Sequence, residues 1–110
     1  MNRLVTYGRR SLPAIVLALA LGAAAVAQQS PEVRAINYTY EPATLTISAG
    51  TMVRFVNLDD DVHTISHRGG LFESGLLFKG DSWTYVFNTP GTYEYFCLPH
   101  PWMQGTIIVQ

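Results

Sequence analysis

The sequence predicts an all-β fold, a Greek-key β-sandwich or barrel of about seven to eight short strands. Short runs rich in β-branched and aromatic residues recur along the chain, and Gly, Pro, Asn or Asp turns separate them. No segment after residue 28 shows the apolar period of an amphipathic helix. With 110 residues, the chain is long enough for one small domain.

The expected strands follow one another at short intervals. They span residues 33–39, 43–48, 51–57, 62–66, 82–87, 92–96 and 106–109. The second and fifth runs alternate between apolar and polar residues, and the fourth is short and β-branched. Turn residues precede three of the runs: Pro42 the second, Gly50 the third and Pro90-Gly91 the sixth. Residues 69–80 are expected to be mostly loop.

The first 27 residues are expected to be a cleaved secretory signal peptide. Residues 1–10 contain three arginines and no acid, and residues 11–27 are apolar and end in Ala-Val-Ala. This order is typical of such a signal. A membrane anchor is the alternative, but the apolar run from residue 12 has 16 residues, and a spanning helix needs about 20. The arginine pair before the run leaves open whether export uses the general or the twin-arginine route.

The mature domain would then be residues 28–110, with the periplasm as its location. It carries four Lys or Arg against eight Asp or Glu, which is a formal net charge of −4. This excess of acid disfavours nucleic acid or an anionic membrane surface as partner. Cys97 is the only cysteine, so it cannot form an internal disulfide. It could form an intermolecular bridge, be a buried inert thiol or bind a metal.

Cys97 shares a short loop with two more metal-binding side chains, His100 and Met103, at intervals of three residues. Thiolate and thioether together favour copper, because a thioether is a poor ligand for zinc. Two histidines, one cysteine and a weak methionine are the ligands of a blue-copper electron-transfer site. Of His63 and His67, only one can reach the same ion, since four residues of strand span about 13 Å. We predict His63, which begins its strand and can lie at the loop's end of the fold.

Two stretches carry a resemblance to a known family. They are Gly91-Thr-Tyr-Glu-Tyr-Phe-Cys-Leu-Pro-His-Pro-Trp-Met-Gln-Gly105 and, upstream, Asn57-Leu-Asp-Asp-Asp-Val-His-Thr-Ile65. Together with residues 70–75, they resemble the plastocyanin- and amicyanin-like cupredoxins, and the resemblance covers roughly residues 33–109. Trp102 and Thr64 depart from the pattern, because amicyanins usually carry Phe at the first position and many cupredoxins carry Asn at the second.

The resemblance implies a soluble electron carrier that cycles one type 1 copper ion between Cu(II) and Cu(I). His63, Cys97 and His100 would be its equatorial ligands, and Met103 its axial ligand. A periplasmic copper storage or chaperone protein is the alternative, but only two methionines follow the expected signal. The chain is not expected to be an enzyme, because four protein ligands leave no open coordination position.

The resemblance also implies that the edge of His100 reaches the surface through an apolar patch of Leu98, Pro99, Pro101 and Trp102. An exposed apolar patch marks an interaction site, and a small contact suits a carrier that must release its partner quickly. The expected partners are redox proteins: a dehydrogenase, a c-type cytochrome or an oxidase. The carrier itself is expected to be a monomer without a membrane anchor.

Three other features receive structural interpretations. His67 is interpreted as an ordinary surface histidine. The acidic run at residues 59–61 is interpreted as a solvated turn, with a surface that steers a partner as the alternative. Trp83, Tyr85 and Phe87 share one face of their strand and are expected to fill the core.

Replacing Pro99 with alanine should raise the redox potential of the copper. Pro99 has no N–H and cannot donate a hydrogen bond to the Cys97 sulfur, and such hydrogen bonds are one control on the potential. We expect a main-chain N–H near Thr64 to be the donor that remains. Voltammetry of the Pro99→Ala protein checks this, and an unchanged midpoint would contradict it.

Overall fold

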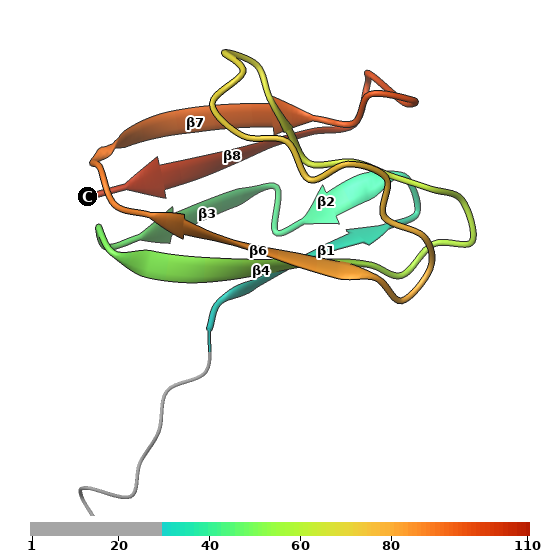
Figure 1. Cartoon of the computed structure of the whole chain (residues 1–110), viewed down its shortest axis with the longest axis horizontal. Helices are drawn as coiled ribbons and strands as arrows, with labels where there is room; N and C mark the ends of the chain where they lie inside the picture. Colours follow the sequence, from blue (N-terminus) through green and yellow to red (C-terminus); the bar gives the residue numbers. More distant parts are fainter. Residues whose placement is uncertain (1–29) are drawn as a thin grey trace, which may run out of the picture.

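Two four-stranded sheets face each other, and the alternation of buried and exposed residues along the strands directs one face of each sheet inward (Figure 1). The computed structural model describes residues 30–110. Its strands are β1 (Glu32–Ile36), β2 (Thr39–Glu41), β3 (Thr44–Ile47), β4 (Thr51–Asn57), β5 (Ser66–His67), β6 (Ser82–Phe87), β7 (Gly91–Phe96) and β8 (Gln104–Val109). The predicted all-β sandwich is confirmed. The expected signal peptide lies outside the described residues.

The sheets have the orders β2-β1-β4-β6 and β3-β8-β7-β5. Each combines one parallel pair, β1 with β4 or β3 with β8, with two antiparallel pairs. Three connections meet at one end of the sandwich: the segment after β4, the segment before β6 and the loop between β7 and β8 (Figure 1). Within residues 30–110, no helix is long and apolar enough to cross a membrane.

The first expected strand is interrupted by a tight turn. Asn37 and Tyr38 both have positive φ angles, 52° and 57°, and they join β1 to β2 as an antiparallel hairpin in which Ile36 pairs with Thr39. Two central residues with positive φ are what a two-residue hairpin of this kind requires. The sequence did not predict the turn, because it lacks the glycine that usually marks one.

The expected strand at residues 62–66 is mostly wrong, because only its last residue belongs to β5. The N–H groups of Val62, Thr64 and Ile65 bind side chains, whereas His63 forms a backbone bridge with Leu77. The N–H of Thr64 donates to Cys97 Sγ at 3.4 Å, and the N–H of Ile65 donates to Ser74 Oγ at 2.8 Å. The segment is thus fixed by its contacts with two loops.

The aromatic face of β6 belongs to the core, as predicted. Phe87 is buried, and Trp83 and Tyr85 pack against the core cluster. Phe72, from the segment expected to be loop, is buried with its ring 4.7 Å from that of Tyr85. The irregular segment before β6 therefore closes one side of the core.

Position 105 requires glycine, because the Tyr95 ring packs directly against it. Gly105 pairs with Tyr95 across β7 and β8, and Tyr95 is fully buried. A Cβ at position 105 would lie 2.2 Å from Cζ of Tyr95 and 2.3 Å from its hydroxyl oxygen. Real atoms do not approach so closely, so a side chain here would displace the phenol from the core.

Replacing Gly105 with alanine should destabilise the fold by about 1–3 kcal/mol, the usual cost of overpacking a core. Urea unfolding monitored by tryptophan fluorescence measures the change. Tyr95→Phe is the matched control, since the buried Tyr95 hydroxyl has no hydrogen-bond partner among the described residues, and losing it should cost little or nothing. Equal stability of Gly105→Ala and the unmodified protein would contradict this account.

Candidate metal centre

The loop between β7 and β8 is closed by a strand pair at its base and by hydrogen bonds along its length. Phe96 pairs with Gln104. The N–H of Cys97 donates to the carbonyl of Met103 at 3.2 Å, and the N–H of Met103 donates to the carbonyl of His100 at 2.9 Å. A proline on each side of His100 fixes φ there. These contacts together determine the backbone of the loop.

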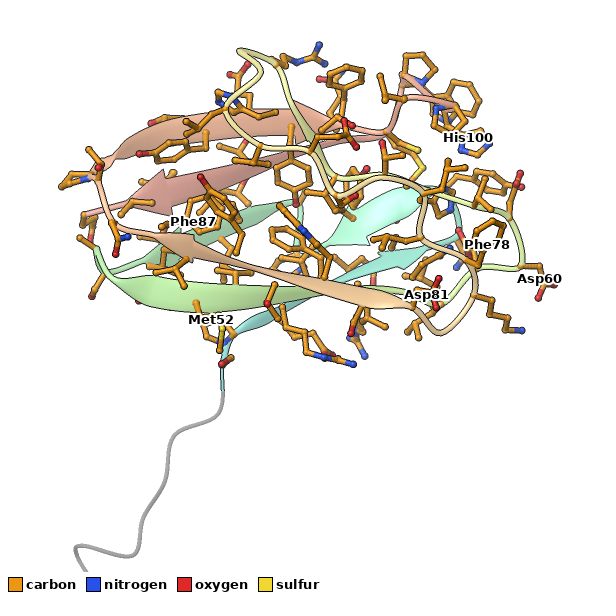
Figure 2. The ribbon with its side chains drawn as sticks, in the orientation of Figure 1. Met52, Asp60, Phe78, Asp81, Phe87 and His100 are labelled. Atoms are coloured by element: carbon orange, nitrogen blue, oxygen red, sulfur yellow. The ribbon has the colours of Figure 1, made fainter. Side chains whose placement is uncertain are left out.

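Three side chains from two segments converge at this end of the sandwich. The donor atoms of His63, Cys97 and His100 all lie within 4.8 Å of one another. The Nδ1 atoms of the two histidines are 3.1 Å apart, and Cys97 Sγ lies 3.6 Å from Nδ1 of His63 and 3.5 Å from Nδ1 of His100. His63 and Cys97 are completely buried, and the His100 side chain is 12% exposed. Figure 2 shows His100 at the loop end of the molecule.

The spacing of these donors fits one metal ion. An ion such as zinc lies about 2.0 Å from imidazole nitrogen and about 2.3 Å from thiolate, so three donors spread evenly around it are about 3.5 to 3.7 Å apart. The separations of 3.1 to 3.6 Å are close to those values. Two imidazoles and one thiolate suit a borderline or soft ion, copper or zinc.

The remaining expected residues lie in different places. Met103 is buried and ends the loop beside β8. His67 lies on β5 and does not belong to the donor group. It is half-buried, and its Nδ1 accepts hydrogen bonds from the N–H groups of Gly69 and Leu71 at 3.2 and 3.0 Å. His67 therefore also orders the turn after β5, a structural role that the sequence interpretation did not include.

His63 is oriented by Asp59, a role that the interpretation of residues 59–61 as a solvated turn missed. Nε2 of His63 lies 2.8 Å from Oδ2 of Asp59, and the N–H groups of Asn37 and Tyr38 donate to the same carboxylate at 2.7 and 2.9 Å. Carboxylates commonly hold metal-binding histidines in this way. An acidic residue in the turn just before a candidate histidine ligand is the signal that could have identified Asp59, because carboxylates commonly bind such histidines.

Asp59 is ionised at neutral pH. Its partial burial favours the neutral acid, but the hydrogen bonds from Tyr38 and His63 outweigh that effect and lower the pKa of Asp59 below its usual value. The carboxylate can therefore accept the Nε2 proton of His63. This assignment leaves Nδ1, the nitrogen beside Cys97 Sγ, with its lone pair free for a metal.

The turn that carries Asp59 is built on a buried amide. Asn57 is completely buried, and its Nδ2 donates to the carbonyls of Asp61 and Leu77, both at 2.8 Å. Its Oδ1 accepts the N–H of Asp59 at 2.9 Å. Both donors of this amide and its oxygen therefore bind the segments around His63.

Thr64 connects the two segments that supply the donors. Its N–H donates to Cys97 Sγ at 3.4 Å, which makes it the main-chain donor expected near this position. Its hydroxyl oxygen accepts the N–H of Leu98 at 2.9 Å and lies 2.8 Å from the Ser66 hydroxyl. Thr64 thus links the segment that carries His63 to the loop that carries Cys97 and His100.

Known proteins share both the sequence pattern and the fold. The family model of the cupredoxin-like domain matches residues 11–109. Amicyanin-alpha of Methylorubrum extorquens is 31% identical over 102 residues, which cover 84% of this chain and 86% of that protein. Plastocyanin of Scenedesmus fuscus is 38% identical over 84 residues, 64% of this chain and 86% of that protein. A Cu(I) form of a methionine-to-alanine mutant of amicyanin superimposes with a TM-score of 0.72 at 28% identity, covering 80% and 89% of the two chains.

Replacing Asp59 with alanine should weaken metal binding by about 10–100-fold, the usual effect of removing such an outer partner. His63 would lose the acceptor that fixes its ring. Competition with a chelator measures the affinity, and circular dichroism checks that the fold is kept. Asp60→Ala is the control, because the Asp60 side chain is 92% exposed and, within residues 30–110, forms an ion pair only with Lys79. Equal losses of metal affinity in the two variants would show that the negative charge of these acids strengthens binding and that the orientation of His63 by Asp59 does not.

Proposed function

Because the chain belongs to the family of cupredoxin-like domains, we propose that it is a soluble periplasmic electron carrier. Its copper, when bound, supplies one-electron chemistry by alternating between Cu(II) and Cu(I). The family match and the donor set of His63, Cys97 and His100 confirm the expected family and the expected cofactor, one type 1 copper ion. The observation that carries the proposal is this buried donor set beside an exposed apolar surface.

We assign His63, Cys97 and His100 as equatorial ligands, on the basis of their mutual distances. We assign Met103 as the axial ligand, because it is buried and its backbone closes the loop against Cys97 and His100. A thioether binds weakly at this position. With four ligands from the protein, the centre is suited to electron transfer and not to binding a substrate.

Contacts around the metal centre restrict the movement of its ligands, as an electron carrier requires. Each oxidation state of copper prefers a different geometry, so a loop free to move would relax after each transfer. Thr64 ties the loop to the His63 segment through two hydrogen bonds, and the prolines beside His100 reduce the freedom of the unfolded loop. The N–H of Thr64 also withdraws electron density from the Cys97 sulfur.

The surface around His100 supports contact with a redox partner. Leu98 and Trp102 are 54% and 65% exposed, and Pro99 and Pro101 are exposed between and beside them. The Trp102 ring lies edge-on to that of His100, with centroids 5.3 Å apart. We propose that this patch docks a dehydrogenase, a c-type cytochrome or an oxidase, and that electrons pass through His100.

We further propose that the carrier is a monomer of residues 28–110, released by cleavage after Ala27. The basic and apolar order of residues 1–27 supports export. The formal net charge of −4 supports a partner with a complementary positive surface.

The mature domain loaded with Cu(II) should show an intense visible thiolate-to-copper band that a mild reductant bleaches reversibly. Cys97→Ser and His63→Ala should lose the band, because each removes an equatorial donor. His67→Ala is the matched control for histidine loss and should keep the band, since His67 lies outside the donor group.

Visible absorption and electron paramagnetic resonance spectra measure these outcomes. A colourless protein, or one that gives up copper readily to a chelator, would contradict the carrier and favour copper storage or delivery. A band that survives in Cys97→Ser would contradict the ligand assignment.

A further inference from the structure

Two side chains that are not ligands cover the outer side of the metal centre. The Tyr38 ring lies edge-on to those of His63 and His100, with centroids 5.4 and 5.0 Å away. Its hydroxyl donates to Oδ2 of Asp61 at 3.0 Å, and the same oxygen lies 3.2 Å from Nε2 of His100. Tyr38 and Asp61, called the cap below, thus lie against the His100 ring on the side of Nε2, away from Cys97.

The turn between β1 and β2 fixes Tyr38 in the cap. A φ of 57° is in the left-handed region, which is uncommon for a bulky side chain and carries a conformational cost. The N–H groups of Asn37 and Tyr38 both donate to Asp59, and these hydrogen bonds offset that cost. The position of the Tyr38 ring is therefore determined by the same carboxylate that orients His63.

Asp61 places a negative charge at the edge of the centre. The Asp61 carboxylate accepts hydrogen bonds from the Val62 N–H and the Tyr38 hydroxyl, and a carboxylate carries a negative charge at neutral pH. Among residues 30–110, no Lys or Arg lies within ion-pair distance of Asp61, and Lys79 pairs with Asp60. The charge is therefore directed at His100 without a competing cation.

We propose that the cap positions His100 and lowers the redox potential of the copper. A negative charge beside a ligand stabilises Cu(II), which carries the larger positive charge, more than Cu(I). A ring held at its outer nitrogen and along its edge also moves less between the two oxidation states. The inference rests on the proposed electron carrier and adds a control on its potential.

Voltammetry of two aspartate variants tests the effect on potential. Asp61→Asn removes the charge and keeps an oxygen that can accept from Tyr38, so the midpoint should shift upward. Asp60→Asn is the matched control, because it removes the same charge one residue away, from a side chain that is 92% exposed. Figure 2 shows Asp60 at the outer tip of its turn, apart from His100. Solvent screens such a charge, so its shift should be clearly smaller.

The positioning role is tested without redox chemistry, in the protein loaded with Zn(II). Nuclear magnetic resonance measures how fast the His100 Nε2 proton exchanges with solvent. Exchange should be faster in Tyr38→Ala than in the unmodified protein, because the ring that covers the imidazole edge is gone. Tyr38→Phe keeps the ring and should change the rate less.

The outcomes separate this inference from the proposed function. Equal midpoint shifts in Asp61→Asn and Asp60→Asn, with the blue band present in both, would overturn the cap's effect on potential and leave the electron carrier standing. Equal proton exchange in Tyr38→Ala and the unmodified protein would overturn its positioning role. Absence of the blue band from the unmodified protein would overturn the proposed electron-carrier function, and with it the proposed effect of the cap on the redox potential.

Discussion

Two hydrogen bonds from Thr64 bring together parts of the chain that lie more than 30 residues apart. Its N–H binds the Cys97 sulfur and its hydroxyl binds the Leu98 N–H, so the segment of His63 and the loop of His100 have one relative position. The bond to Cys97 is buried, where an unpaired partner would be costly, and the bond to Leu98 is partly buried. The short distances among the three metal donors follow from this link.

Around that link, buried polar side chains form hydrogen bonds with neighbouring groups. Asn57, His63, Thr64 and Ser66 are each at most 3% exposed, and each has a hydrogen-bond partner among neighbouring segments. A satisfied polar network in a low-dielectric interior is rigid and specifies one arrangement. The rest of the core is apolar and aromatic and sets the distance between the sheets, while this network sets the geometry at one end.

The sheets and the donor residues were predictable because each depends on a local pattern. Alternation marked β3 and β6, and the spacing of Cys97, His100 and Met103 marked the loop. The partners of the donors were not predictable in the same way. Asp59 and Asp61 look like solvated acids in the sequence, and their contacts with Tyr38 depend on a hairpin that has no glycine to reveal it. The segment at residues 62–66 has strand composition, but two of its N–H groups donate to Cys97 Sγ and Ser74 Oγ, and composition does not encode such partners.

Asp59 serves both the β1–β2 turn and His63, so metal loading and the order of that turn are thermodynamically linked. A ligand that binds only the folded state stabilises every part of the structure whose opening would release it. Opening of the turn at Asn37 and Tyr38 frees the carboxylate that holds a metal donor. The amide protons of these two residues therefore report metal occupancy through their hydrogen exchange, even for ions that have no colour.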